Sequence, residues 1–299
     1  MNREATGLAG VRHKAYETLG STNAEALALV RAGERGPLWI TALSQSAGRG
    51  RRNSTWVSPP GNLYATLLLT EPAAPELAPQ LSFVTALALH DAVAACAPQL
   101  GPLLKVKWPN DLLLGHAKVA GILIEGEGGP KFSVAVGIGV NCTAHPQVTS
   151  YPATDLSSAG ALVTPAQLLA ALSAAMQSRL LQWQRGQGFF SIRADWLKRA
   201  AGLGAAIQVR LPEREFAGRF EGLDDAGRLL VREAGGVTTV TAGEVFGLSP
   251  FIPPLKGEGR TAESGSGRGH LSSAAPAMTP TRTASLSDLP LAGGGKEKS

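Results

Sequence analysis

Apolar and polar positions alternate in two different ways along residues 1–203. Short apolar runs predict strands, and longer segments with apolar residues three to four positions apart predict helices. The predicted strands span 38–43, 63–69, 103–107, 119–125 and 132–140, and the predicted helices span 76–97, 165–185 and 190–200. Such a mixture is typical of a sheet covered by helices. The sequence therefore predicts a mixed domain of α-helices and β-strands in this stretch.

One more helix is predicted near the N-terminus. Ser21 or Thr22 can cap its first turn, because a short hydroxyl side chain accepts a hydrogen bond from an unpaired backbone N–H. The apolar residues that share one side of this helix are Ala24, Leu27, Ala28 and Ala32. We expect that side to face the sheet, and we expect the helix to end at Gly33.

Residues 205–250 have the period of half-buried strands. Ile207, Val209 and Leu211 alternate with polar residues, and turn sequences at 224–227 and 235–236 separate the next apolar runs. Four or five strands in so short a stretch predict a small β-barrel. Because such a domain has little core of its own, we expect it to pack against its neighbour.

The last 49 residues differ in composition from the rest of the chain. They contain five Pro, eight Gly and eleven Ser or Thr residues. Few apolar side chains are left to offset the entropy of the chain. We therefore predict three parts: a mixed domain at 1–203, a small β domain at 204–250 and a disordered tail at 251–299.

Charge and cysteine content narrow the class of protein. The net charge is +5, which is compatible with an anionic ligand but is too weak by itself to indicate nucleic-acid binding. Cys96 and Cys142 have neither disulfide-framework nor metal-site spacing. The N-terminus lacks an apolar signal core, and polar residues such as His90 and Asp91 leave the apolar stretches too short for a membrane span. We expect a reduced, cytoplasmic protein that does not bind a membrane.

The strongest local signal is a glycine-rich basic loop at 45–56, directly after a predicted strand. Its arginines Arg49, Arg51 and Arg52 repel one another unless an anion lies near. Gly48 and Gly50 let the backbone approach a ligand and offer N–H donors to a phosphate or carboxylate. The loop lacks the P-loop and dinucleotide signatures. A solvated basic turn and an RNA-binding loop remain alternatives.

Four further segments carry polar residues at the ends of predicted elements. In 107–111 (Lys-Trp-Pro-Asn-Asp), the Asn amide can read an adenine edge and the Asp can hold Mg²⁺. Lys118 begins an apolar strand in which Gly121 leaves room for a ligand, and its ammonium can neutralise a carboxylate or phosphate. A strand with glycine gaps ends at Asn141, and 21–23 (Ser-Thr-Asn) gathers short donors and acceptors. Each segment alone is also compatible with an ordinary cap, turn or strand end.

In their order and spacing, these motifs together resemble the biotin protein ligases, the biotin–[acetyl-CoA carboxylase] ligase family. The matching segments are 21–23, Gln45 with 48–52 and Trp56, 107–111, 118–123 and 137–141. The resemblance extends over roughly residues 15–250. It implies an α+β fold, in which a catalytic domain like that of class II aminoacyl-tRNA synthetases has a mixed sheet covered by helices and precedes a small SH3-like barrel.

The resemblance also implies an activity. Members of the family join biotin to ATP, hold the biotinyl-5′-adenylate and pass biotin to one lysine of a biotin carboxyl carrier protein, the acceptor of acetyl-CoA carboxylase or a related carboxylase. ATP and Mg²⁺ are the expected cofactors, biotin is the expected substrate, and both a monomer and a homodimer are compatible with the family.

Site residues follow from the same resemblance, position by position. Those with an implied catalytic role are Lys118, Arg49 and Arg51. Those implied to bind biotin are Ser21, Thr22, Asn23, Gln45, Arg49, Gly50, Arg51, Lys118 and Gly121. Those implied to bind ATP are Arg51, Trp56, Lys107, Trp108, Asn110 and Asn141, with Asp111 as the candidate for Mg²⁺.

Two departures and two alternatives qualify this picture. Residues 53–55 (Asn-Ser-Thr) replace the Gly-Arg that many bacterial members carry before the tryptophan, so one phosphate-contacting arginine is missing. About 20 residues precede Ser21, too few for the helix-turn-helix domain of members that repress transcription, so we expect no DNA binding.

A lipoate–protein ligase shares the fold and the adenylate chemistry, although lipoate lacks the ureido group that suits residues 21–23. RNA binding through the basic loop is the alternative from a different class.

Overall fold

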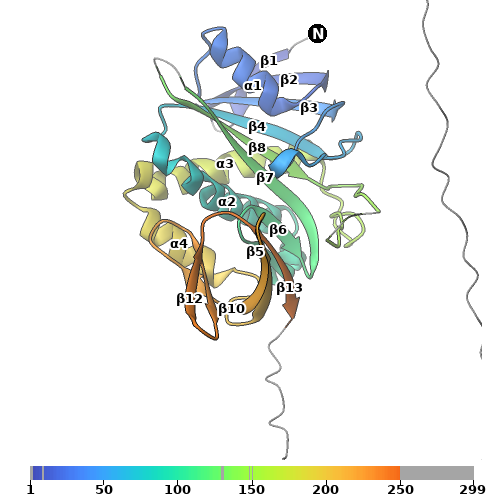
Figure 1. Cartoon of the computed structure of the whole chain (residues 1–299). Helices are drawn as coiled ribbons and strands as arrows, with labels where there is room; N and C mark the ends of the chain where they lie inside the picture. The colour runs from blue at the N-terminus through green and yellow to red at the C-terminus, as the bar shows by residue number, and fades with distance from the viewer. Residues whose placement is uncertain (1–2, 9, 129–130, 148, 150, 250–299) are drawn as a thin grey trace, which may run out of the picture. The chain divides into compact units, whose positions relative to one another are not determined.

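An eight-stranded sheet forms the centre of the fold (Figure 1). The computed structural model describes residues 3–8, 10–128, 131–147, 149 and 151–249, so the predicted tail at 251–299 lies outside the described residues. The strands in spatial order are β1 (Arg3–Leu8), β2 (Val11–Leu19), β3 (Leu38–Gln45), β4 (Leu63–Thr70), β8 (Ser133–Val140), β7 (Ala117–Glu127), β6 (Asp111–Leu114) and β5 (Leu104–Lys107). Only β2 and β3 pair in parallel among these neighbours. The predicted mixed sheet is confirmed.

Three of these strands were not predicted from the sequence. The described positions of β2 are half-buried or exposed, so its apolar pattern is weak. β6 has only four residues and follows β5 after the turn 108–110. β1 pairs with β2 at the edge of the sheet. Edge strands and very short strands give the weakest sequence signal because an edge strand alternates weakly and four residues are too few to establish a period.

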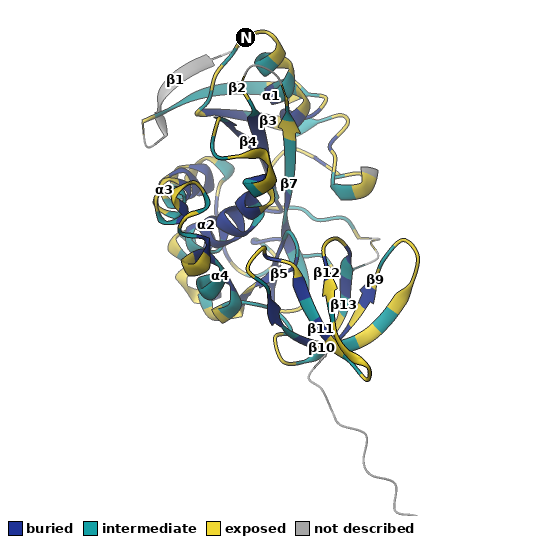
Figure 2. Ribbon diagram, turned by 60° about the vertical axis from the view of Figure 1, so that its left-hand side comes forward, coloured by how far each residue is buried: buried dark blue, intermediate teal, exposed yellow. Residues whose placement is uncertain are grey.

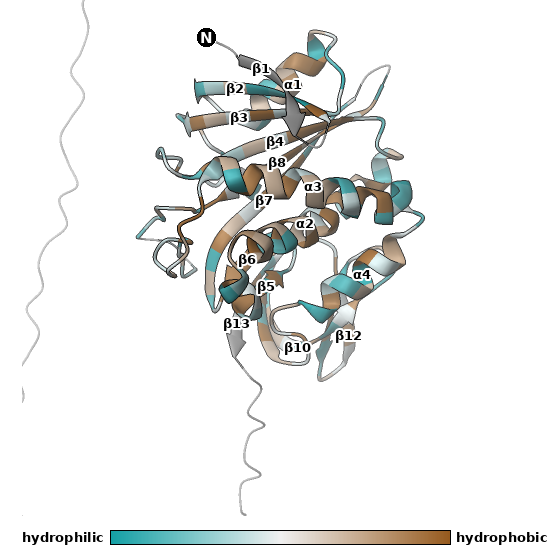
Figure 3. Cartoon of the chain, turned by 180° about the vertical axis from the view of Figure 1, so that it is seen from behind, coloured by the Kyte–Doolittle hydropathy of each residue, from teal (hydrophilic) through white to brown (hydrophobic). Residues whose placement is uncertain are grey.

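Helices cover both faces of the sheet (Figures 2 and 3). The helices are α1 (Thr22–Arg31), α2 (Leu81–Cys96), α3 (Pro165–Trp183) and α4 (Phe189–Lys198), and short 3₁₀ turns lie at Arg51–Asn53, Pro75–Gln80, Pro98–Leu103 and Gln184–Gly186. α2 and α3 pack on one face, and α1 packs on the other. The helix predicted from residue 76 begins as a 3₁₀ turn, because Pro79 has no N–H for an α-helical hydrogen bond.

The side of α1 that faces the sheet is not the predicted one. Its buried residues are Thr22, Asn23 and Ala26, whereas Ala24 and Ala28 are exposed. Ala26 joins a small apolar cluster beneath the helix whose other members are Leu38, Ile40, Leu68 and Ala135. The polar first turn is buried because distant side chains satisfy its hydrogen bonds, and this rotation of the helix brings Thr22 and Asn23 toward the sheet.

A five-stranded antiparallel sheet follows, with the strand order β12-β11-β10-β9-β13. Its strands are β9 (Ala206–Arg210), β10 (Glu215–Leu223), β11 (Leu229–Glu233), β12 (Gly236–Val240) and β13 (Glu244–Ser249). Its apolar residues belong to the same core cluster as those of α2, α3 and the large sheet. The turn at Gly227 lies against Phe83 of α2 and Phe189 of α4. The small β domain therefore packs against its neighbour, as expected for so small a core.

The stretch Pro75–Cys96 corrects one expectation from the sequence. Its 22 residues are long and apolar enough to cross a membrane by length and composition, although we expected every apolar stretch to be too short. In the fold, 61% of its most apolar window is buried, and α2 packs against α3 in the main core. A core helix of a folded domain explains its hydropathy.

Candidate functional site

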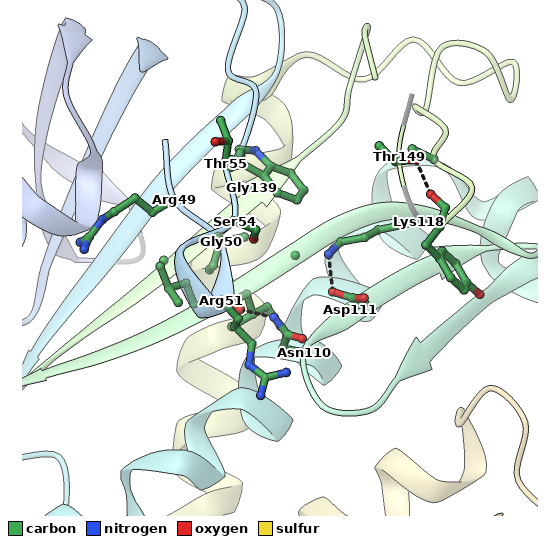
Figure 4. A pocket seen from close by; sticks show the side chains of 18 of the residues that line it. Arg49, Gly50, Arg51, Ser54, Thr55, Asn110, Asp111, Lys118, Gly139 and Thr149 are labelled. Carbon is green, nitrogen blue, oxygen red and sulfur yellow. Dashed lines mark hydrogen bonds and ion pairs between the residues drawn. The ribbon is translucent and has the colours of Figure 1, made fainter. Parts of the chain in front are cut away.

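A cavity of about 480 Å³ opens between the basic loop, the ends of the central strands and β13 (Figure 4). Every residue that the sequence nominated lines it. These are Ser21, Thr22, Asn23, Gln45, Arg49, Gly50, Arg51, Trp56, Lys107, Trp108, Asn110, Asp111, Lys118, Gly121 and Asn141. The fold thus brings five separate sequence segments to one place.

A carboxylate between two lysines forms the charged end of the cavity. Asp111 Oδ1 lies 2.6 Å from Lys118 Nζ, and Asp111 Oδ2 lies 3.5 Å from Lys107 Nζ. Lys107 is buried, and its ammonium lies 4.0 Å from the centre of the Tyr151 ring. Burial lowers the pKa of Lys107, and the Asp111 carboxylate partly offsets this effect. Lys118 keeps 27% of its side chain exposed, so its ammonium can meet an anionic ligand.

Short polar side chains form the opposite, uncharged end. Gln45 Oε1 accepts hydrogen bonds from the Thr22 backbone N–H at 2.8 Å and from the Thr22 hydroxyl at 3.2 Å. Gln45 Nε2 donates to Ser58 Oγ at 3.0 Å, and the Thr22 and Thr66 hydroxyl oxygens lie 2.8 Å apart. Ser21 is the N-cap of α1, as predicted, and its Oγ accepts from Ala24 N. The Ser21 hydroxyl hydrogen and the second Gln45 N–H remain for a ligand among the hydrogen bonds of the described residues.

Asn23 is locked in place from several sides. Its Oδ1 accepts from Thr66 Oγ1 at 2.7 Å, and its Nδ2 donates to the Leu123 carbonyl at 3.2 Å and to Glu125 Oε2 at 2.8 Å. A Cβ added at Gly137 would lie 2.4 Å from Asn23 Oδ1. Only glycine at this position of β8 lets the side chain lie flat on the sheet.

Replacing Gly137 by alanine tests this packing. We expect Gly137→Ala to lower the free energy of unfolding by about 2 kcal/mol, because Asn23 has no free direction in which to move. Ligand binding in the cavity should weaken with it. Chemical denaturation of Gly137→Ala, with Gly128→Ala as the control in open space, measures the effect. Equal stability of the two variants would contradict the packing argument.

The basic loop is a small hairpin whose arginines already meet protein anions. Backbone bonds join Gly50 N to the Ser54 carbonyl and Trp56 N to the Gly48 carbonyl. Arg49 Nη2 lies 2.9 Å from Glu125 Oε2, and Arg52 Nη1 lies 3.8 Å from Glu244 Oε1. The anions expected beside the loop arginines are therefore, for Arg49 and Arg52, glutamates of distant strands.

Arg51, between those two arginines, is the most buried of the three. Its Nη1 lies 3.4 Å from the Gly243 carbonyl of the small β domain. Burial and repulsion by Arg52 lower the pKa of its guanidinium. A bound anion beside Arg51 would relieve both effects.

Trp56 covers the floor of the cavity between its two ends. Its ring lies over the gaps at Gly121 and Gly139, where an added Cβ would lie 3.0 Å and 2.5 Å from ring atoms. Its indole Nε1 is buried without a hydrogen-bond partner among the described residues. The ammonium of Lys118 lies 5.4 Å from the ring centre. A ligand on this floor has to displace the indole or lie against it.

The other aromatic and amide residues support the walls. The buried Trp108 donates its Nε1–H to the Gly227 carbonyl at 3.1 Å, which ties the turn 108–110 to the small β domain. Asn110 Nδ2 donates to the Ile122 carbonyl at 2.6 Å, and Asn141 Nδ2 donates to the Thr154 carbonyl at 2.9 Å. These contacts hold the strand ends in place around the cavity.

Sequence reasoning missed two contributors to the site. One is the segment after β8, from which Pro146, Thr149 and Tyr151 line the cavity. The other is the start of β13, which supplies Glu244 and Phe246. These residues lie in turn-rich or alternating stretches and form no motif, so only their position in the fold reveals them.

The segment after β8 is held by a buried carboxylate. His145 Nδ1 lies 2.6 Å from Asp155 Oδ2, and Asp155 also accepts from Ser157 Oγ and from the backbone and hydroxyl of Ser158. Burial alone would raise the pKa of Asp155, but these hydrogen bonds outweigh it and lower the pKa to about 2. The closed segment holds Tyr151 over Lys107.

This carboxylate predicts a dependence of stability on acid. Because the folded-state pKa lies below the ordinary value of 3.8, ionised Asp155 stabilises the fold above about pH 4, and that stability is lost as pH falls toward 2. We expect Asp155→Asn to cost about 2 kcal/mol at pH 7 and progressively less between pH 4 and 2. Urea denaturation at several pH values measures it. A constant deficit across that window would assign the loss to shape and not to charge.

The predicted magnesium ligand Asp111 has two lysines as neighbours in this cavity. The described residues contain no cluster of three or more His, Cys, Asp or Glu side chains that could hold a metal ion. In this arrangement the Asp111 carboxylate orients two ammonium groups, and its role toward Mg²⁺ stays a prediction.

Comparison with known proteins agrees with this geometry. Residues 21–141 match the biotin/lipoate A/B protein ligase family, and residues 202–247 match the biotin protein ligase C-terminal domain. The fold and the cavity thus define the class as a biotin/lipoate-type protein ligase. The biotin–[acetyl-CoA-carboxylase] ligase of Paracoccus denitrificans is 44% identical over 238 residues, which are 76% of this chain and 96% of that protein. This chain belongs to the biotin protein ligase family.

Solved structures resemble it over the same region. The Aquifex aeolicus biotin protein ligase in complex with biotin and ATP matches with a TM-score of 0.67 and 24% identity over 78% of this chain and 97% of that one. The Leishmania major biotin protein ligase in complex with biotinyl-5-AMP matches with a TM-score of 0.56 and 28% identity over 77% of this chain and 98% of that one. The predicted fold is confirmed.

Proposed function

We propose that this protein activates biotin with ATP as biotinyl-5′-adenylate and transfers it to one lysine of a biotin carboxyl carrier protein in the cytoplasm. The observation that supports this most directly is the polarity of the cavity around Lys118 and Thr22. One end offers short neutral donors and acceptors, and the other end offers two ammonium groups around one carboxylate. A ligand with a hydrogen-bonding ring at one end and a carboxylate at the other matches this arrangement.

The ring end fits a ureido group. The Ser21 hydroxyl can donate to the ureido carbonyl oxygen, and the Thr22 hydroxyl oxygen can accept from a ureido N–H. Gln45 holds Thr22 through two hydrogen bonds, so this donor and acceptor are positioned before the ligand arrives. The aliphatic tail would lie over Gly121 and Gly139 after displacing the Trp56 indole from these glycines.

The charged end fits the first chemical step. The biotin carboxylate oxygen attacks the α-phosphorus of ATP, a P–O bond forms, and pyrophosphate leaves with the electrons of the broken bond. Lys118 neutralises negative charge on the carboxylate and the α-phosphate, and Asp111 at 2.6 Å holds its ammonium in place. Arg51 and Lys107 provide further positive charge for the nucleotide. ATP would arrive as its Mg²⁺ complex, and Asp111 stays the residue that we propose to hold this ion.

The second step needs no nucleophile from this chain. The amine of the acceptor lysine attacks the carbonyl carbon of the mixed anhydride, an amide bond forms, and AMP leaves. Holding the reactants together accounts for catalysis of such a step. The basic loop, which lines the cavity, would keep water from the anhydride once both substrates are bound.

The direct test is incubation with biotin, Mg²⁺-ATP and a biotin carboxyl carrier domain, followed by mass spectrometry of the domain. We expect a gain of one biotinyl group on one lysine and release of pyrophosphate. Lipoyl transfer in place of biotinyl transfer would identify a lipoate–protein ligase, and salt-dependent RNA binding without pyrophosphate release would identify an RNA-binding protein. The match of residues 202–247 to the biotin protein ligase C-terminal domain favours biotin.

A further inference from the structure

Glu125 on β7 joins two parts of the site that are far apart in the sequence. Its Oε2 accepts a hydrogen bond from Asn23 Nδ2 at 2.8 Å and another from Arg49 Nη2 at 2.9 Å. Asn23 lies in the first turn of α1, and Arg49 lies in the basic loop. Glu125 itself is not among the residues that line the cavity, so it acts on the site through these two neighbours.

Asn23 has little left to offer a ligand. Its amide has two N–H donors, and these go to Glu125 and the Leu123 carbonyl, while its oxygen accepts from Thr66. It is only 2% exposed. Asn23 is therefore better placed to hold Glu125 than to read the substrate.

Arg49 points away from the charged end of the cavity. In Figure 4 its side chain leaves the loop on the side opposite to the Lys118–Asp111 pair. Its partner Glu125 also binds Asn23, the residue that follows Thr22 in the neutral corner. The Arg49 guanidinium consequently lies near the ring end, and its remaining N–H groups are donors for a carbonyl oxygen there.

We infer that Glu125 is a positioning residue that holds Arg49 at the ureido end of the biotin pocket, so that Arg49 recognises the neutral ring and not the carboxylate. This inference rests on the proposed function, since it assigns the two ends of the cavity to the two ends of biotin. It also changes the role that the family resemblance implied for Arg49. The biotin carboxylate is then bound by Lys118 and Arg51.

The test uses two ligands that differ only at the carboxylate: biotin and biotinol, in which a primary alcohol replaces it. Isothermal titration compares wild-type protein with Glu125→Gln. The control is Glu127→Gln, two residues along β7, whose partner Arg31 at 2.7 Å is exposed. We expect Glu125→Gln to weaken both ligands by the same factor of about ten, and Glu127→Gln to leave both within twofold.

A second test, in a protein that already carries Arg49→Gln, separates the positioning of Arg49 by Glu125 from a general loss of structure. In Arg49→Gln protein, adding Glu125→Gln should cause no further loss of affinity, because the residue it positions is already gone. An undiminished tenfold loss there would contradict the inference, and so would weakening of biotin alone, which would put Arg49 at the carboxylate. Unchanged affinity of Glu125→Gln for both ligands would also overturn it. Wild-type protein that binds neither ligand would contradict the proposed function itself.

Discussion

Lys118→Ala is expected to abolish formation of the adenylate while leaving the protein folded. Lys118 carries the ammonium that faces the cavity, and its loss removes the charge that offsets the developing negative charge at the carboxylate and α-phosphate. We expect biotin-dependent release of pyrophosphate to fall about 10³-fold. The stability of the protein should change little, because the side chain is partly exposed and Asp111 keeps Lys107 as a partner.

The matched control is Lys105→Ala on the edge strand β5, where the side chain is exposed and does not line the cavity. Pyrophosphate release from biotin and ATP, measured together with a thermal unfolding curve, separates the two variants. Turnover of Lys118→Ala close to that of Lys105→Ala would remove Lys118 from the chemical step.

Asp111→Asn is expected to have the largest effect on stability and a strong effect on activity. The carboxylate is the counter-charge of two ammonium groups, one of which belongs to the buried Lys107. Breaking a buried ion pair from one side costs about 3 kcal/mol, because the remaining charge stays buried without a partner. We also expect adenylate formation to fall, since Lys118 loses the group that orients it.

The dependence on pH gives this prediction a second measurement. Burial already places the pKa of Lys107 below its unfolded value, so the charged form destabilises the fold at neutral pH. Loss of that proton relieves the cost, and the deficit of Asp111→Asn should therefore shrink as pH rises toward 10. Chemical denaturation at pH 7 and pH 9.5 compares the two conditions.

A compensating substitution distinguishes stability from catalysis. Lys107→Met added to Asp111→Asn removes the unpaired buried charge and should restore most of the lost stability. It should not restore adenylate formation, because Lys118 still lacks its carboxylate partner. Recovery of activity together with stability would show that Asp111 serves the fold alone.

Most of the site could be predicted from the sequence because its residues lie in short, rigid motifs. The cap at Ser21, the glycines of the basic loop and the lysine at the head of β7 each have a local physical reason. All of the nominated residues line one cavity. By contrast, Tyr151 and Glu244 lie in no motif and were found only in the fold.

Ranges and orientations were less predictable than the existence of elements. The prediction of which face of α1 is buried was wrong, because the apolar residues Ala24 and Ala28 and the polar pair Thr22 and Asn23 lie on different faces of the helix. Only one of these faces can pack against the sheet. The polar pair is buried since Thr66, Gln45 and Glu125 satisfy its hydrogen bonds, and a local pattern contains no information on these distant partners.

By itself, then, the sequence determined which chemical groups this protein brings to a biotin and ATP site, because strand period, caps and glycine gaps are local properties. Only the tertiary structure decided what those groups do. In the fold, Arg49 and Arg52 pair with glutamate carboxylates, Asn23 binds Glu125, and Asp111 lies between two lysines. The reason is that charge pairing and hydrogen-bond satisfaction depend on distances between residues as far apart in the chain as Arg52 and Glu244, which the fold alone sets.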